Sequence, residues 1–362
     1  EYHKLADGEC YIDTSFHLIV NEPSESVLGQ ELPALVDEGY TSFKIFMTYE
    51  GLALNDREIL DVLDTARGCG ALVMVHCESY DAIRYMTEKL EREGRTLPRH
   101  HATSRPKVVE REATHRAISH AELVDVPIMI VHVSNRDAME QIRWAQQRGV
   151  KILGETCTQY LVLTESDLDG LNMEGAKYVC SPPPRDRDSQ DACWDGLRSG
   201  TFSVFSSDHC PFRYDDEQGK LAPKGRTSFR WVPNGIPGVG ARLRILFSEG
   251  VMKGRITLEQ FVALTATNHA RIYGLYPRKG TIAIGADADI AIWDPQARYT
   301  LTHDLIRDGS DYTPYEGFEI TGRPVLTMSR GKVVARDGEL TGEKGHGIYL
   351  PRERSPFSTG AR

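Results

Sequence analysis

The sequence predicts an α/β protein in which a (β/α) barrel is followed by part of a small β domain, and three observations support this prediction. First, short apolar runs rich in β-branched and aromatic residues alternate with amphipathic helical stretches from residue 11 to residue 209, which is the pattern of a parallel sheet. Second, several runs are apolar on both faces, as expected where helices cover a barrel and side chains fill it. Third, after residue 280 the pattern changes to strands and turns without helices.

The predicted barrel strands are YIDTSFHLIV (11–20), FKIFM (43–47), ALVMVH (71–76), PIMIVHV (127–133), VKILGET (150–156) and FSVFSSDH (202–209). Between them, stretches such as 28–39, 55–70 and 137–149 repeat apolar residues three and four positions apart, which predicts helices. A complete barrel of this type has eight strands. The chain therefore shows about six of the eight.

The C-terminal part of the chain has a different sequence pattern. GTIAIGADADIAIWDP (280–295) and PVLTMSRGKVVARDGEL (324–340) alternate apolar and polar residues between turn residues, which is typical of strands. The polar connection 213–235 is long for a structureless segment of a compact domain and predicts a functional or mobile loop. We expect a barrel domain at 10–280, the C-terminal part of a small β domain at 281–345, and a tail at 346–362.

The composition excludes several classes of partner. A net charge of −9 without a sustained run of Lys and Arg argues against nucleic acid and membrane binding and leaves a small-molecule substrate. The seven cysteines form no CxxC pair, which suits a reducing cytoplasm. No apolar run approaches the roughly 18 residues of a membrane span. Residues 1–10 contain neither a Met nor a signal-peptide core, so we expect a cytoplasmic chain that begins inside a larger protein.

Lys44 is the most unusual residue of a predicted strand. It lies between Phe43 and Phe46 in the run TSFKIFMTY, and a buried ammonium is unfavourable unless it is paired, loses its proton or is chemically converted. Three other polar groups lie at strand ends, where a barrel builds its active site: His76, His132 and Asp208. Each alone is compatible with a hydrogen-bonded core histidine or a helix N-cap.

Together, the four residues are better explained as a metal site. Two imidazoles and a carboxylate are suitable ligands for a divalent ion, above all Zn²⁺. An ammonium would repel the ion, whereas a lysine that has added CO₂ becomes an anionic carbamate with two oxygens. That conversion would also remove the buried positive charge on Lys44.

At this point the chain resembles a known family. The motifs FKIFMTY, VMVHCES, HHATSRP, IVHVSN, GETCTQYL, KYVCSPPPR, SSDHCPF, PNGIPG and NHARIYGLYPRKGTIAIGADADIAIWDP occur in the order of the dihydropyrimidinase and D-hydantoinase (phenylhydantoinase-like) branch of the cyclic amidohydrolases. The resemblance implies a TIM-like (β/α)8 metal-dependent hydrolase that opens dihydropyrimidines or 5-substituted hydantoins to N-carbamoyl amino acids. It further implies a role in pyrimidine catabolism and a homotetramer or homodimer.

The resemblance also implies roles for single residues. Lys44 would be the carboxylated ligand that bridges two divalent metal ions, His76 and His132 ligands of one ion, and Asp208 a ligand of the other ion and the proton shuttle. In the strand GETCTQYL the chain departs from the family form, with Thr158 where Pro is usual.

Three further residues would contact the substrate. Tyr49 would donate a hydrogen bond to the oxyanion of the tetrahedral intermediate, and its alternative role is aromatic packing under the barrel rim. Ser181 and Asn234 would hold the cyclic ureide, and their alternative role is that of turn residues before Pro or Gly. We place His100, His101 and His115 at the surface or at an interface.

One feature of the family is missing. The His-x-His pair that ligates the second metal on the first strand does not occur in this chain, so we expect an absent N-terminal portion and one incomplete metal site. Two alternatives stay open: a catalytically impaired dihydropyrimidinase-like scaffold protein, and an allantoinase or dihydroorotase.

Overall fold

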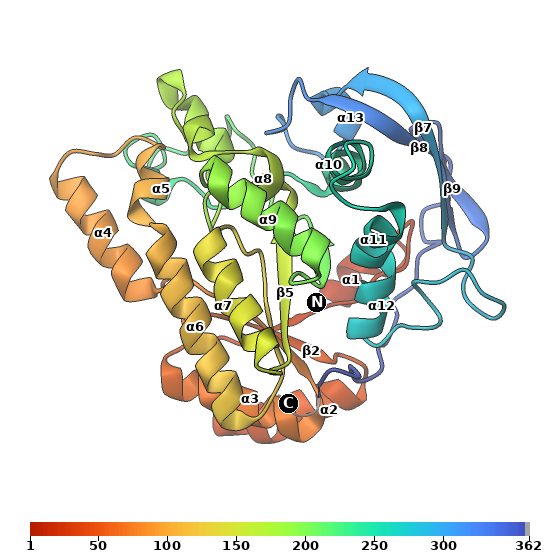
Figure 1. Cartoon of the computed structure of the whole chain (residues 1–362), viewed down its shortest axis with the longest axis horizontal. Coiled ribbons are helices and arrows are strands. Elements are labelled where there is room, and N and C mark those ends of the chain that lie inside the picture. The colour runs from red at the N-terminus through yellow and green to blue at the C-terminus, as the bar shows by residue number, and fades with distance from the viewer. Residues whose placement is uncertain (359–362) are drawn as a thin grey trace.

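The computed structural model describes residues 1–358 and contains the predicted parallel sheet. Its strands pair in chain order, each parallel to the next. They are β1 (Leu18–Ile19), β2 (Ser42–Phe46), β3 (Leu72–His76), β4 (Ile128–Ile130), β5 (Ile152–Cys157) and β6 (Val204–Ser206). All six predicted runs therefore contribute a strand, and helices flank the sheet (Figure 1). The predicted fold class, a (β/α) barrel with a small β domain, is confirmed.

Alternation of side chains along the strands divides the core into two parts. Val73 and Val75 of β3 join a large cluster with the apolar faces of the helices. Leu72 and Met74 of the same strand lie in a second cluster with Met129 and residues of β5 and β6. Successive strand residues point to opposite faces, so the first cluster is the layer between sheet and helices and the second is the barrel interior.

The helices begin and end at recognisable signals. Helix α3, for example, starts with a capping box between Asn55 and Glu58 and ends at Gly70, whose φ of 75° is left-handed. The helical elements up to β6 are α1 (Tyr2–Ala6), η1 (Val27–Glu31), α2 (Leu32–Asp37), α3 (Asp56–Cys69), α4 (Tyr80–Arg92), α5 (His100–Ser104), α6 (Lys107–Val124), α7 (Arg136–Gln147), α8 (Thr158–Val162), η2 (Glu165–Leu168), η3 (Leu171–Tyr178) and α9 (Arg187–Ser199). Those after β6 are η4 (Phe229–Trp231), α10 (Val239–Ile245), η5 (Leu246–Val251), α11 (Leu258–Val262), η6 (Ala263–Thr267), α12 (Asn268–Ile272) and α13 (His303–Ile306).

Among the described helices, none combines the length and apolar character that a membrane crossing requires.

A second, antiparallel sheet lies beside the barrel helices α10 and α11 (Figure 1). It contains β7 (Ile290–Thr300), β8 (Glu319–Ser329), β9 (Lys332–Arg336) and β10 (Glu339–Leu340) in the order β10-β9-β8-β7. Residues 280–289, which also alternate in sequence, form turns instead of a strand.

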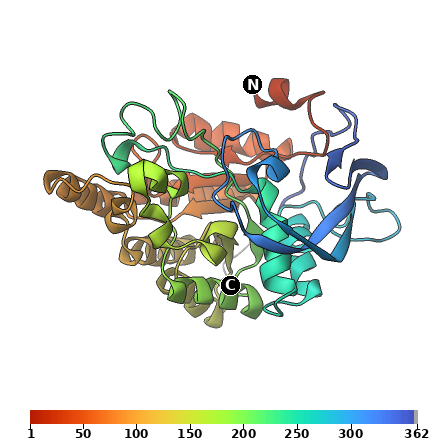
Figure 2. The ribbon, with the colours of Figure 1, turned by 90° about the horizontal axis from the view of Figure 1, so that it is seen from above.

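The first predicted strand is shorter than expected because its early residues pair with the end of the chain. Thr14 forms a parallel bridge with Tyr349, and the carbonyl of Cys10 accepts hydrogen bonds from Gly345 and Gly347. Figure 2 shows the N-terminal segment, in red, near the C-terminal part of the chain, in blue. Only Leu18 and Ile19 therefore remain to pair with β2.

Candidate active site

The predicted metal ligands lie at the carboxyl edge of the parallel sheet. Lys44 is inside β2, next to Met74 of β3, and shares the face that points into the barrel. His76 is the last residue of β3. His132 follows β4 by two residues, and Asp208 follows β6 by two residues. Because parallel strands present their carboxyl ends at the same edge, these four side chains converge although they are far apart in sequence.

The two histidines are in direct contact. His132 Nε2 lies 2.9 Å from His76 Nδ1, and their ring centroids are 4.3 Å apart. Both imidazoles are buried, and burial lowers the pKa of each well below its ordinary value. Both rings are therefore neutral near pH 7, the form that ligates a metal ion.

A buried carboxylate orients His76 from the other side. Glu78 Oε2 lies 2.8 Å from His76 Nε2 and also 2.8 Å from Arg105 Nη1. All three side chains are buried. A histidine whose second nitrogen contacts a carboxylate is the usual arrangement at metal sites, and here it leaves Nδ1 of His76 free to face His132.

Lys44 has no hydrogen bond or ion pair with another side chain in the described part of the chain. Its Nζ lies 5.1 Å from the ring centroid of Phe46. Burial lowers the pKa of Lys44 to about 8, although Asp208 and Glu155 act in the opposite direction. A lysine with a lowered pKa is more readily deprotonated, and the neutral amine is the form that can add CO₂.

Asp208 and Glu155 provide negative charge next to Lys44. Burial raises the pKa of Asp208 to about 7, Lys44 lowers it and Glu155 raises it further. Such a carboxyl group can take up and release a proton near neutral pH. Glu155 Oε1 accepts the backbone N–H of His132 at 3.3 Å, and this contact fixes the loop that carries the second histidine.

Three of the candidate residues have a left-handed backbone. The φ angles of Tyr49, His132 and Asp208 are 78°, 41° and 46°. Residues other than glycine rarely adopt positive φ, and such strain persists where the surroundings impose it, often at active sites. Its occurrence at three strand ends of one sheet edge indicates a functional site.

The candidate substrate-binding residues border this centre. The ring of Tyr49 lies 5.3 Å from that of His76, and burial raises the pKa of Tyr49, so its hydroxyl keeps its proton. Tyr49 also forms a hydrogen bond with Ser181. Tyr49 and Asn234 line a cavity of about 250 Å³, and Asn234 Oδ1 is buried without a partner within the described residues.

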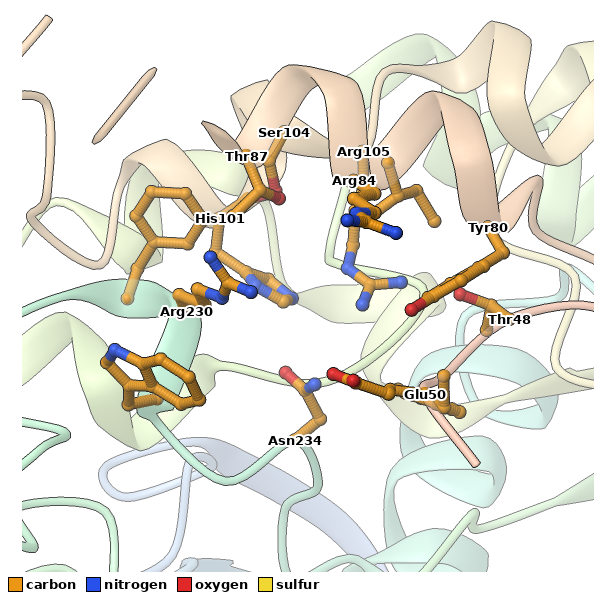
Figure 3. A pocket seen from close by; sticks show the side chains of 14 residues that line it. Thr48, Glu50, Tyr80, Arg84, Thr87, His101, Ser104, Arg105, Arg230 and Asn234 are labelled. Carbon is orange, nitrogen blue, oxygen red and sulfur yellow. The ribbon is translucent and has the colours of Figure 1, made fainter. Parts of the chain in front are cut away.

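This cavity is mostly polar. Figure 3 shows Asn234 and Glu50 across the opening from His101 and Arg105. The guanidinium of Arg105 lies 5.6 Å from the ring centroid of Tyr49. The cavity therefore connects the predicted oxyanion donor with the predicted ureide-binding amide.

The expectation that His101 lies at the surface or at an interface is wrong. Its side chain is buried, and its Nε2 donates to the carbonyl of Cys180 at 2.8 Å. The reason is that α5 packs against the segment before Ser181. Sequence reasoning also missed Glu78, Arg105 and Glu155, although Glu78 follows His76 by only two residues and the spacing could have indicated it.

The donor set fits a metal ion only when Lys44 is included. Within residues 1–358, no group of three His, Cys, Asp or Glu side chains is arranged to hold a metal ion. His76 Nδ1 and His132 Nε2 instead lie 2.9 Å apart, and Lys44 acts electrostatically on both rings. Conversion of Lys44 to an anionic carbamate would supply the missing oxygen donor. Asp208 would be available to a second ion beside the same carbamate.

Comparison with known proteins agrees with this site. A family model described as Amidohydrolase family matches residues 29–334. The D-hydantoinase of Ralstonia pickettii is 45% identical over 97% of this chain and 76% of that protein. The crystal structure of dihydropyrimidinase from Brevibacillus agri NCHU1002 superposes with a TM-score of 0.95 at 42% identity, covering 98% of this chain and 76% of that one. An L-hydantoinase (dihydropyrimidinase) from Arthrobacter aurescens has a TM-score of 0.86 at 29% identity, covering 95% of this chain and 75% of that one.

The chain therefore belongs to the amidohydrolase family, whose members are generally dinuclear metal-dependent hydrolases. Its relatives define the branch more closely. Within the family it is a cyclic amidohydrolase of the dihydropyrimidinase and D-hydantoinase group.

Proposed function

We propose that the protein hydrolyses the ring amide of 5-substituted hydantoins and dihydropyrimidines to N-carbamoyl amino acids. The observation that carries this proposal is the buried His76–His132 pair, which lies at one sheet edge with Lys44 and Asp208. A relative of the scaffold type would be expected to have lost metal ligands, whereas all four residues are present here.

The proposed cofactor of the intact protein is a pair of divalent metal ions, most suitably zinc, which a carboxylated Lys44 would help to hold. In this chain the second metal site lacks the His-x-His pair and is incomplete. His76 and His132 would hold one ion, because both rings are neutral and converge. Asp208 would contact the other. When bound, the ions supply a hydroxide nucleophile near neutral pH by lowering the pKa of water.

The remaining steps are assigned to residues of this chain. Asp208, a carboxyl group at the same sheet edge as Lys44 and the two histidines, would take the proton of the attacking water and return it to the leaving ring nitrogen. Positioned acid–base groups of this kind contribute about 10²–10⁴-fold to the rate. Tyr49 keeps its proton and would donate it as a hydrogen bond to the developing oxyanion. Ser181 and Asn234 would bind the N–C=O groups of the ureide.

The relatives favour one configuration of the substrate. Proteins named D-hydantoinase are 38–45% identical to this chain, whereas the L-hydantoinase of Arthrobacter aurescens is 29% identical. We therefore propose turnover of D-5-monosubstituted hydantoins. We also propose a homo-oligomer, a dimer or a tetramer, which light scattering can measure.

The test is a substrate panel with metal-loaded protein. It contains dihydrouracil, D- and L-5-phenylhydantoin, allantoin and dihydroorotate, and Asp208→Asn serves as the inactive control. We expect ring opening of dihydrouracil and of D-5-phenylhydantoin, with product N-carbamoyl amino acid detected by its ureido group. Turnover of allantoin or dihydroorotate alone would assign the protein to a different cyclic amidohydrolase. Absence of turnover on the whole panel would contradict the proposal.

A further inference from the structure

Lys220 is an unusual residue in the polar loop 213–235. Its side chain is 0% exposed, although the loop around it is rich in charged residues. No described carboxylate forms an ion pair with it. Its Nζ instead donates to two backbone carbonyls, those of Val179 and Pro233, each at 2.6 Å. A buried amino group is unfavourable unless hydrogen bonds compensate it, and here two backbone carbonyls provide that compensation. The position of these two carbonyls indicates what the lysine does.

The two carbonyls belong to the two segments that carry Ser181 and Asn234, the residues proposed to bind the ureide. Val179 precedes Ser181 by two residues, and Pro233 directly precedes Asn234. The carbonyl of Val179 also accepts the N–H of Gly235 at 3.1 Å. The Lys220 amino group therefore links the backbone just before Ser181 to the backbone just before Asn234 and holds the two segments at a fixed distance.

A third segment, residues 212–213 after β6 and Asp208, also contacts Lys220. Nζ of Lys220 lies 5.8 Å from the ring centroid of Phe212, four residues after Asp208. The backbone N–H of Lys220 donates to the carbonyl of Arg213 at 2.8 Å. The lysine is thus connected to the loop after β6 as well as to the two substrate segments.

Asn234 shows why the spacing matters. Its Oδ1 is buried and has no hydrogen-bond partner within the described residues, and it borders the cavity beside Tyr49. A polar atom left unpaired in this way is available to a ligand. Its usefulness depends on its position relative to Ser181, because a small rigid ureide offers its donors and acceptors at one fixed separation.

We propose that Lys220 is a positioning residue that sets the separation of Ser181 and Asn234 for a small cyclic ureide. This inference rests on the proposed function, since the ureide is the ligand of that site. It assigns Lys220 no contact with the substrate or the metal ions. Loss of the ammonium should therefore weaken substrate binding more than it slows the chemical step.

The first experiment compares Lys220→Met with Lys224→Met. Lys224 is in the same loop, but its side chain is exposed, so it controls for the loss of a positive charge. For dihydrouracil we expect Lys220→Met to raise KM by about 10–100-fold, the range typical of residues that orient ligands from behind, with metal content unchanged and a much smaller change in kcat. Lys224→Met should behave like the wild type. Equal losses in kcat, or an unchanged KM, would overturn the proposal.

The second experiment is chemical rescue. Lys220→Ala removes a propylammonium-sized group, so added propylamine should lower the raised KM, whereas propanol should not. Failure of the amine to lower KM contradicts the proposal. A variant that loses its fold outright also overturns it, because the lysine would then hold the whole structure and not two segments. Inactivity of the wild type on every cyclic ureide is a different result, which refutes the proposed function and is seen before any variant is compared.

Discussion

Glu78 allows the most direct test of how this site is held together. The proposed change is Glu78→Gln, which keeps the size of the side chain and removes its charge. The carboxylate makes two hydrogen bonds of 2.8 Å, to Arg105 and to His76, in a fully buried position. A hydrogen bond to a charged group contributes about 1.5–3 kcal/mol and a neutral one about 0.5–1.5 kcal/mol. After the change, the bond from neutral His76 becomes a neutral one, whereas the bond from Arg105 still involves a charged group, so these ranges predict a loss of about 1–1.5 kcal/mol in the free energy of unfolding.

The same change should weaken metal binding. The Glu78 carboxylate orients the His76 ring by its contact with Nε2 of that ring. An amide at position 78 would orient the ring less firmly. Replacement of groups that contact a metal ligand from behind typically costs about 10–100-fold in metal affinity. Urea unfolding of the metal-free protein measures the first effect, and zinc competition with a chromophoric chelator measures the second.

A matched control separates the buried carboxylate from surface charge. Glu88 pairs with Arg84 one turn away on the exposed face of α4, so Glu88→Gln should leave both the urea midpoint and the zinc affinity at wild-type values. Burial raises the pKa of Glu78, whereas Arg105 and Arg185 lower it. If the Glu78 carboxyl group were already protonated, Gln would match it in charge as well as in shape. A loss of stability below about 0.5 kcal/mol would then be observed, and the reasoning from a charged pair would be refuted.

Three other variants test separate parts of the structure. Lys44→Ala should lose metal and activity, and small carboxylic acids should restore part of both by replacing the bridging oxygens; full metal content by atomic absorption would disprove the carbamate. Tyr49→Phe should lower kcat by about 10²–10³-fold with metal retained, because it removes one oxyanion donor; an unchanged kcat would leave Tyr49 a packing role. Gly274 has a φ of 70°, and a Cβ there would meet the carbonyl oxygen of Glu353 at 1.9 Å. Gly274→Ala should therefore lower the midpoint of thermal unfolding, because the C-terminal segment would be displaced. An unchanged midpoint would show that this contact is dispensable.

The six barrel strands were predictable from sequence because each buried run is locally distinctive. β3 and β5, for example, are apolar runs bounded by helical patterns; β3 lies within its predicted range, and β5 extends one residue beyond its own. The ends of strands were less predictable. β1 keeps two of ten predicted residues because Cys10 and Thr14 pair with the C-terminal segment more than 300 residues away, and no local pattern encodes such a contact.

The metal ligands also followed from sequence, at least as candidates. Lys44, His76, His132 and Asp208 stand out because polar groups at the ends of buried strands are rare and unfavourable without a function. Their convergence follows from the parallel order of the strands alone. The assignment of each role, and the boundaries of the two domains, stay predictions.

What the sequence determined by itself was therefore the barrel and the set of polar residues at its carboxyl edge, since both depend on residue types within short stretches of the chain. The tertiary structure alone decided which groups support that edge. Glu78 meets Arg105 across α4 and α5, and Lys220 joins the carbonyls of Val179 and Pro233. The physical reason is that the free energy of a buried charge depends on its partners, and these partners come from segments whose proximity only the folded chain creates.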